Sequence, residues 1–221
     1  MNRLILLLFF PLILFSCIGT DVIDDEVFPE KIQITNSVSA LKVGESYLFE
    51  AVYFGTSGEM EDVELTWTTA NESILSISKG GLATAIDTGM TYVIVKSGIT
   101  SDSVSVTSGS ATVISETERR GSFQGLNNYT VEGSFTLELK GSSFDLVFAE
   151  NFSATQGPGL HVYLTNNTNS VSGGVDLGEL KANSGGQTYE VEDKELFNAY
   201  DYVMIYCKPF GVPFGLGTIE N

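Results

Sequence analysis

Hydrophobic and polar residues alternate along most of the chain from residue 31 onward. Leu65 and Trp67 fall on one side of a short segment, as do Val104 and Val106. Later residues repeat the pattern in longer sets, namely Phe135, Leu137 and Leu139; Phe144, Leu146 and Phe148; and Leu160, Val162 and Leu164. A period of two is typical of a β-strand with one buried face, and no long segment has a helical period. The sequence therefore predicts an all-β protein.

Turn signals separate these segments at short intervals. They include Gly44-Glu45, Ser57-Gly58, Lys79-Gly80-Gly81 and Thr88-Gly89. Glycine adopts positive φ at little steric cost, so it suits tight turns between antiparallel strands. Many short strands joined in this way favour β-sandwiches or barrels.

Residues 109–118 interrupt the alternation with small, polar and charged side chains. We interpret them as a linker between two β domains, at residues 31–108 and 119–221. The Arg119-Arg120 pair that follows predicts a solvated face, with a contact to acidic residues of the other domain as the alternative.

Four segments of the first domain occur in a specific order. They are IQIT at 32–35, LKVGESYLFEAVY at 41–53, LTWTTANESILSISKGGLATAIDTG at 65–89 and TYVIVKSG at 91–98. In this order they resemble the group-two bacterial immunoglobulin-like (Big) domains. The resemblance implies an Ig-like β-sandwich with Trp67 at the centre of its core and no disulfide beside it. It also implies a role as a spacer, or alternatively as an adhesive module.

The second domain carries another ordered set of segments. They are GSF at 121–123, VEG at 131–133, ENF at 150–152, GPGLHVYL at 157–164, LGELK at 177–181 and YVMIYCKPFGVPFG at 202–215. This set resembles the DM-thirteen domain, the electron-transfer module of Skeletor-type proteins, which is related to the DOMON β-sandwiches. The resemblance implies a second antiparallel β-sandwich or barrel. It also implies a redox role for a cysteine in the penultimate strand, which matches Cys207.

The family resemblance leaves the cofactor question open. Related DOMON domains bind haem or sugar, and the family often has a histidine where this chain has Asn127-Asn128-Tyr129. His161 is the only histidine, and alternation puts it on the opposite face from Leu160 and Val162, so we expect a solvent-side or hydrogen-bonded residue. Haem ligation by His161 with Met204 is chemically possible, but the chain has no CxxCH attachment sequence.

The residue types of the chain give little support for a metal site or for a hydrolase or transferase active site. One histidine and one available cysteine do not suffice for an ordinary zinc site, so no metal is predicted. No G-x-S-x-G sequence or other hydrolase or transferase motif occurs, and we predict that the protein is not an enzyme of these classes. No cofactor is predicted apart from acyl chains on Cys17, for the reason given next.

Residues 1–17 have the order of an export signal. Arg3 is followed by an apolar stretch from Leu4 to Phe15, then by Ser16 and Cys17. Twelve helical residues cover roughly 18 Å, which is too short to span an apolar layer of about 30 Å. The end of the stretch, LFSC, resembles the lipobox of bacterial lipoproteins. The resemblance implies cleavage after residue 16 and a diacylglycerol on Cys17 that anchors the protein to membrane lipid.

Charge narrows the possible partners. The chain has 11 Lys and Arg against 28 Asp and Glu, and removal of residues 1–16 takes away one of the cations. Such an acidic protein repels phosphate backbones, so no nucleic acid partner is expected. Residues 17–30 carry five acids and predict an extended tether. Acidic residues just after a lipid-bearing cysteine resemble the surface-export signals of some outer-membrane lipoproteins, and the alternative is a solvated spacer. Together with the lipobox, this resemblance implies a lipid-anchored protein of the bacterial cell envelope, at the outer membrane and exposed at the surface.

Two functions remain open from the sequence. If residues 199–207 form one strand, Cys207 shares a face with Val203 and Ile205, which predicts burial. Pro209 and Gly211 nevertheless end the strand just after it, where a thiol can be open to a redox partner. The first hypothesis is a redox or electron-transfer module working through Cys207. The alternative is an adhesion or binding module with a structural Cys207, recognising a glycan or an envelope protein through loops 151–159 and 165–174.

Overall fold

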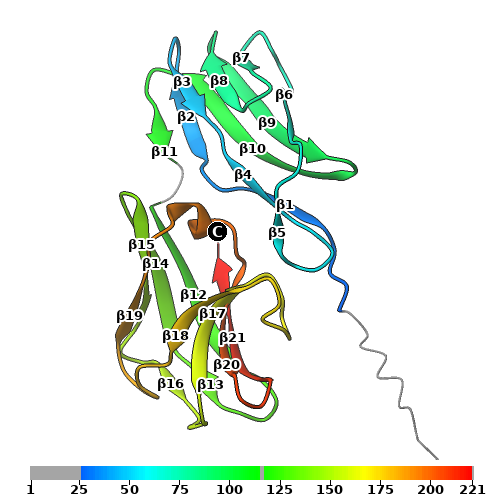
Figure 1. Ribbon diagram of the computed structural model, residues 1–221. Helices are drawn as coiled ribbons and strands as arrows, with labels where there is room; N and C mark the ends of the chain where they lie inside the picture. The colour runs from blue at the N-terminus through cyan, green and yellow to red at the C-terminus, as the bar shows by residue number, and fades with distance from the viewer. Residues whose placement is uncertain (1–25, 115–116, 221) are drawn as a thin grey trace, which may run out of the picture.

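The structure is a computed structural model that describes residues 26–114 and 117–220. Within these ranges it contains 21 strands and one short 3-10 helix, which confirms the all-β prediction. None of the described helical residues forms a helix long and apolar enough to cross a membrane. The predicted signal peptide, Cys17 and most of the predicted tether lie outside the described residues. Two units stack end to end, with the N-terminal strands at the top of Figure 1 and the C-terminal strands below.

The N-terminal unit consists of three small sheets. The first has the order β1-β4-β5, the second β11-β2-β10-β9-β6 and the third β3-β8-β7. Its strands are β1 (Lys31–Ile34), β2 (Val38–Lys42), β3 (Ser46–Leu48), β4 (Ala51–Phe54), β5 (Met60–Glu61), β6 (Thr66–Thr69), β7 (Leu75–Ile77), β8 (Leu82–Ala85), β9 (Gly89–Ser97), β10 (Thr100–Gly109) and β11 (Val113–Ile114). Strand β11 lies within the predicted linker and pairs with β2.

The C-terminal unit is built on one eight-stranded sheet that curls into a near-barrel. Its order is β18-β17-β20-β21-β12-β14-β15-β19, and the two end strands approach each other. The strands are β12 (Glu118–Gly125), β14 (Ser134–Lys140), β15 (Ser143–Phe148), β17 (Leu160–Thr165), β18 (Val175–Glu179), β19 (Gln187–Val191), β20 (Tyr202–Cys207) and β21 (Val212–Glu220). A two-stranded sheet of β13 (Val131–Glu132) and β16 (Ser153–Ala154) and the helix η1 (Lys194–Phe197) complete the unit.

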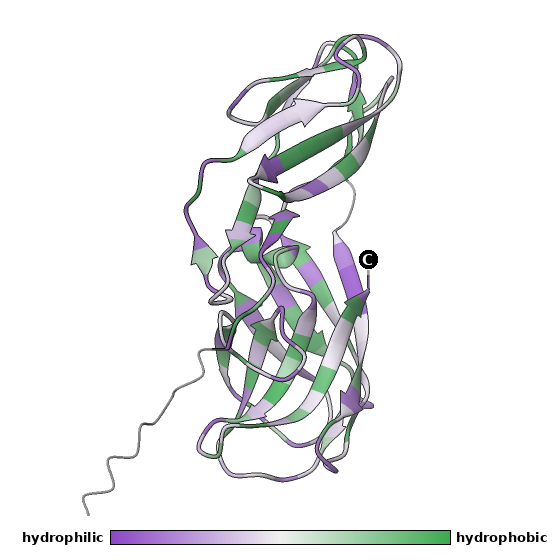
Figure 2. Cartoon of the chain, turned by 90° about the vertical axis from the view of Figure 1, so that its right-hand side faces the viewer, coloured by the Kyte–Doolittle hydropathy of each residue, from purple (hydrophilic) through white to green (hydrophobic). Residues whose placement is uncertain are grey.

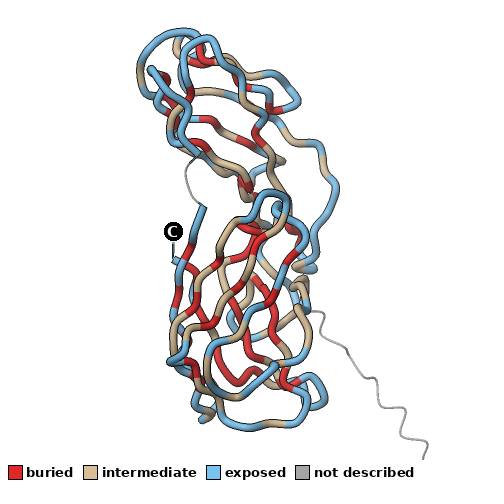
Figure 3. Tube along the Cα trace, turned by 90° about the vertical axis from the view of Figure 1, so that its left-hand side faces the viewer, coloured by how far each residue is buried: buried red, intermediate tan, exposed pale blue. Residues whose placement is uncertain are grey.

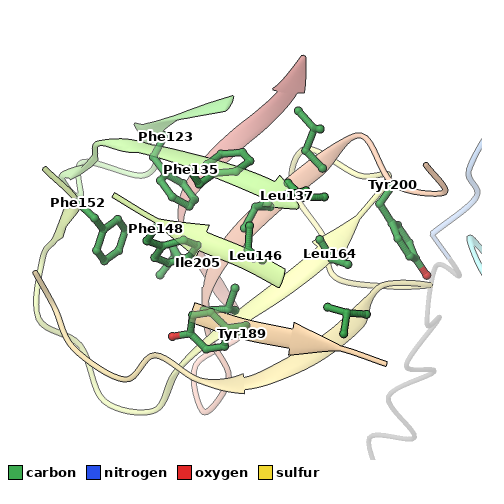
Figure 4. Close-up of a cluster of buried hydrophobic side chains, with 14 of the residues drawn as sticks. Phe123, Phe135, Leu137, Leu146, Phe148, Phe152, Leu164, Tyr189, Tyr200 and Ile205 are labelled. Carbon is green, nitrogen blue, oxygen red and sulfur yellow. The ribbon is translucent and has the colours of Figure 1, made fainter. Parts of the chain in front are cut away.

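Each unit has its own hydrophobic core. The residues of the three predicted sets in the C-terminal unit are buried, except for the partly buried Leu139. Buried positions alternate with intermediate or exposed ones along most strands in Figure 3, as hydrophobic and hydrophilic positions do in Figure 2. Aromatic rings gather at one end of the C-terminal core, as the left side of Figure 4 shows for Phe123, Phe148 and Phe152. In the N-terminal unit Trp67 is only 8% exposed, as predicted.

Close packing in the C-terminal core depends on glycines. A Cβ atom at Gly217 would lie 2.4 Å from Phe135 Cε1, and one at Gly121 would lie 2.3 Å from Phe135 Cζ. Neighbouring strands β12 and β21 thus leave room for the Phe135 ring directly over their backbones.

The units meet through the β4 strand and the loop before β20. Phe54, at the end of β4, belongs to the C-terminal core, and its ring lies edge-on to Tyr200 with centroids 5.5 Å apart. Around it, Lys31 Nζ donates to Asp201 Oδ2 at 2.7 Å, and Asn198 Nδ2 donates to the Thr35 carbonyl at 2.9 Å. The side chain of Tyr200 marks the end of the core that faces the N-terminal strands in Figure 4.

The predicted solvated face at Arg119-Arg120 is wrong for one of the two residues. Arg120 is exposed, but Arg119 is only 4% exposed. Its Nη1 donates to the carbonyls of Phe197 at 2.9 Å and of Tyr200 at 3.3 Å. Alternation along β12 turns Arg119 inward, and backbone carbonyls at the end of η1 and just after it accept hydrogen bonds from its guanidinium group, as a buried charge requires.

Candidate functional site

Cys207 is the last residue of β20, as the sequence predicted for the penultimate strand. It lies between Leu160 of β17 and Val212 of β21. Val203, Ile205 and Cys207 all face the core, and each is at most 1% exposed. The alternation of the strand therefore turns the thiol inward.

A single loop separates this thiol from the surface. Cys207 Sγ donates a hydrogen bond to the carbonyl of Pro158 at 3.1 Å, and Pro158 itself is exposed. The loop of residues 155–159 continues over the strand end, where Lys208 N donates to the Gly159 carbonyl at 3.1 Å. A Cβ at Gly157 would lie 2.7 Å from Phe214, so the loop packs closely on the core. The thiol is therefore covered in this conformation by the single loop that carries Pro158.

The neighbouring cation points away from the sulfur. Lys208 Nζ donates to Asp176 Oδ2 at 2.9 Å, on the outer face of the sheet. This agrees with the expectation that successive strand residues point in opposite directions.

The outer face of β17 carries a hydrogen-bonded cluster around Asp176 of β18. His161 Nδ1 lies 2.9 Å from Asp176 Oδ1, and Tyr163 donates its hydroxyl to Oδ2 at 2.9 Å. The Gly178 amide donates to Oδ1 at 2.9 Å, which orients the carboxylate from within its own strand. We refer to His161, Tyr163, Asp176 and Lys208 as the Asp176 cluster.

Electrostatics in the Asp176 cluster favour an ionised carboxylate. Burial by itself raises the pKa of Asp176, but hydrogen bonds from His161, Lys208, the Gly178 amide and Tyr163 outweigh it and hold that pKa well below its usual range. Burial, followed by the hydrogen bond to this carboxylate, raises the pKa of Tyr163 to about 12. The cluster therefore pairs a neutral phenol with an acceptor that stays charged at neutral pH.

Tyr163 belongs to a wider aromatic surface over β20. Its ring lies edge-on to Tyr206, with centroids 5.8 Å apart, and Met204 lies directly opposite it in the strand register. Met204 has no exposed surface, although alternation puts it on the opposite face of β20 from the buried Val203, Ile205 and Cys207. His161 and Met204 share this outer face on neighbouring strands, with His161 opposite Tyr206 rather than Met204. The structure thus brings the two candidate haem ligands near each other but not into direct register.

Sequence reasoning missed Asp176 and Tyr163. Asp176 is one of 28 acidic residues, and no local motif distinguishes it. It reaches His161 because β17 and β18 pair with a register shift between His161 and Tyr163. A bulge of this kind re-aims side chains and leaves no clear signal in an alternating sequence.

The predicted binding loop 165–174 lines a cavity of about 290 Å³ between the two units. From the N-terminal unit the cavity is lined by Phe28 and Phe54, and from the loop by Asn166 and Asn167. Asn167 Nδ2 is buried without a hydrogen-bond partner among the described residues. The other predicted loop, 151–159, contributes the cover over Cys207.

Comparisons with known proteins bear mainly on the C-terminal unit. Residues 122–219 match the family model described as Electron transfer DM13. No curated protein matches the chain. Among solved structures, the chain is similar to the S-layer protein rSbsC, with 14% identity, a TM-score of 0.31, and coverage of 88% of this chain and 28% of that protein. A structure of three immunoglobulin domains of titin is similar at 8% identity and a TM-score of 0.23, over 86% of this chain and 96% of that one.

The TM-scores of these structures are too low to carry an argument about function, and the chain spans less than a third of the length of the S-layer protein. The match to the family model is informative, because it covers the eight-stranded near-barrel from the fifth residue of β12 almost to the end of β21. It also contains Cys207 and the whole Asp176 cluster. The family match therefore supports a DM13 domain at residues 122–219 of this chain.

Proposed function

We propose that this protein is a lipid-anchored cell-envelope protein whose DM13 domain has a redox role through Cys207. An Ig-like N-terminal unit acts as the spacer that presents it. The observation that carries the proposal is the position of the thiol within a domain of an electron-transfer family. Cys207 sits at a strand end, hydrogen-bonded to the carbonyl of an exposed loop, so a local movement of residues 155–159 uncovers it.

The chemistry of a lone thiol requires a partner. Cys207 is a free cysteine, so no second cysteine of the described residues can resolve an oxidised form. Once uncovered and deprotonated, the Cys207 thiolate attacks a disulfide of an envelope protein. A mixed disulfide forms, and the partner's other sulfur leaves as a thiolate that takes up the proton. A second thiol of the partner, as its thiolate, then attacks the partner's sulfur in the mixed disulfide. The partner's disulfide forms again, and Cys207 leaves as a thiolate that takes up a proton.

Attachment to the membrane follows from the lipobox-like sequence before Cys17. Acyl chains on this residue, at about 0.8 kcal/mol per buried methylene, hold the protein at a leaflet. The acidic residues that follow keep the β units away from anionic headgroups. The domain would then meet its redox partner at the envelope surface.

Thiol labelling tests the proposal on the chain carrying Cys17→Ser. We expect a maleimide to label Cys207 in the native protein at a rate set by loop opening, well before global unfolding. Gly157→Ala pushes a methyl group against Phe214 and should speed the labelling. Gly80→Ala is the matched control, since a Cβ there has nothing within 4 Å. Labelling that occurs only at the rate of global unfolding, in both variants, would rule out the redox role.

A second candidate function is non-enzymatic binding, with Cys207 structural. The specific observation in its favour is the interdomain cavity with the unpartnered Asn167 Nδ2. A buried donor without a partner costs free energy that a ligand with an acceptor recovers. Under this alternative, Cys207→Ala leaves binding to envelope fractions unchanged, whereas Asn167→Leu weakens it.

A further inference from the structure

Tyr163 is a buried phenol that the proposed thiol chemistry does not use. Its residue exposure is 7%, although it lies on the outer face of the near-barrel, away from the main core. Cys207 lies on the opposite face of β20, so the two residues occupy separate sites. What distinguishes Tyr163 is its hydrogen-bond acceptor, which is a carboxylate.

The Asp176 carboxylate is already positioned to accept the proton of the Tyr163 hydroxyl. Asp176 is fixed by Lys208 Nζ and by the Gly178 amide, both at 2.9 Å, so it does not need to move when the phenol loses its proton. Loss of an electron turns a phenol into a very strong acid. Even a carboxylate that is stabilised in its charged form then accepts the phenolic proton along the existing 2.9 Å hydrogen bond.

The surroundings offer a short route for the electron to the surface. Tyr206 lies on the neighbouring strand with its ring centroid 5.8 Å from that of Tyr163, and it is half-buried whereas Tyr163 is buried, so it is the more exposed of the two rings. Met204, whose thioether is polarizable, is fully buried, lies opposite Tyr163 in the strand register and is two residues before Tyr206 on β20.

We propose that Tyr163 is a redox-active tyrosine that gives up one electron, through Tyr206, to a high-potential one-electron oxidant docked on the outer face of β17 and β20. In this step the Tyr163 O–H bond breaks, its proton goes to Asp176, and its electron goes to the oxidant. The products are a neutral tyrosyl radical, a protonated Asp176 and the oxidant reduced by one electron. The step needs no thiol and goes beyond the proposed role of Cys207.

Another tyrosine of the same domain provides an internal comparison. Tyr189 is 3% exposed, and its hydroxyl donates to the side-chain amide oxygen of Gln187 at 2.8 Å. It matches Tyr163 in burial and in having a short hydrogen bond. An amide oxygen is a far weaker base than a carboxylate, so Tyr189 lacks a proton acceptor and should not form a stable radical.

The test oxidises the full chain carrying Cys17→Ser with photogenerated tris(bipyridine)ruthenium(III) and traps radicals by rapid freezing for EPR. Tyr163→Phe should lose most of the neutral tyrosyl signal, and Asp176→Asn should lower its yield because an amide does not accept the proton. Tyr189→Phe should keep the wild-type signal. A parallel series with Cys207→Ala should give the same order, which separates this site from the thiol.

Folding of each variant is checked by circular dichroism and thermal unfolding. A second measurement does not depend on variants: a nitroso spin trap is added to the wild-type chain, and adducts are mapped by peptide mass spectrometry. Adducts on Tyr163 or Tyr206 support the proposal. A full tyrosyl signal in Tyr163→Phe, or adducts confined to other tyrosines, would overturn it without bearing on Cys207.

Discussion

The carboxylate of Asp176 joins three strands of the near-barrel. It contacts His161 and Tyr163 of β17, the Gly178 amide of β18 and the side chain of Lys208, which follows β20. A charged acceptor with several donors is stronger than the same number of neutral hydrogen bonds. One residue therefore joins the edge strand β18 to β17 and to the end of β20.

Asp176→Asn should lower the free energy of unfolding by about 1–3 kcal/mol at neutral pH, because hydrogen bonds to a charged group are lost. The pKa of Asp176 is lowered in the folded state, so its stabilisation is present above the unfolded pKa of about 3.9 and is lost as pH falls below it. Urea unfolding at several pH values should thus show a weaker acid dependence for Asp176→Asn than for wild type. Asp62→Asn, at an exposed position, serves as the control. An equal acid dependence for wild type and Asp176→Asn would contradict the lowered pKa.

Strands β12 and β21 show how the C-terminal core is built at the level of elements. Their paired backbones approach the Phe135 ring so closely that glycine is required on both sides. The alternation of β14, β15 and β17 was predictable, because each strand keeps one face in the core. The need for Gly121 and Gly217 was not, since it depends on which ring packs over them.

Gly217→Ala should destabilise the C-terminal unit by about 1–3 kcal/mol, the usual cost of overpacking a filled core. The new methyl group would lie 2.4 Å from Phe135 and 3.0 Å from Phe123, so a ring or a strand must shift. Chemical denaturation followed by circular dichroism measures the change. Gly109→Ala, where a Cβ meets nothing within 4 Å, should stay within about 0.5 kcal/mol of wild type. Similar stability for Gly217→Ala would show that the seam between β12 and β21 can relax.

The two units are joined by a shared hydrophobic contact in addition to the chain connection. Phe54 sits in a strand of the N-terminal unit but packs in the C-terminal core against Tyr200. The partly exposed Lys31–Asp201 pair beside it adds little, since ion pairs of this kind contribute about 0–1 kcal/mol. Burial of Phe54 therefore contributes more to the coupling between the units than this ion pair does.

Phe54→Ala should cost about 3–5 kcal/mol, as expected for removal of a buried aromatic ring, and should uncouple the units. Differential scanning calorimetry should then resolve two transitions in place of a more cooperative one. Phe49→Ala, which changes the core of the N-terminal unit only, should lower the unfolding temperature without splitting the transition in two. If Phe54→Ala still unfolds in one transition, another contact carries the coupling.

The sequence by itself determined the strands, the inward faces and the burial of Cys207, because side chains alternate with a period of two wherever a strand has one face in a core. It also determined the family resemblance of the C-terminal unit, which the match at residues 122–219 confirms. The signal, the lipid anchor and the Ig-like assignment remain predictions.

Tertiary structure alone decided what covers and surrounds these residues. The loop carrying Pro158 reaches Cys207 across 49 positions of sequence, and Asp176 meets Lys208 across 32. Met204 is buried on an outer face by its aromatic neighbours, and Phe54 packs in the core of the other unit. Alternation is a local property, whereas these contacts depend on strand order and register. Neither is encoded by the period of any single strand.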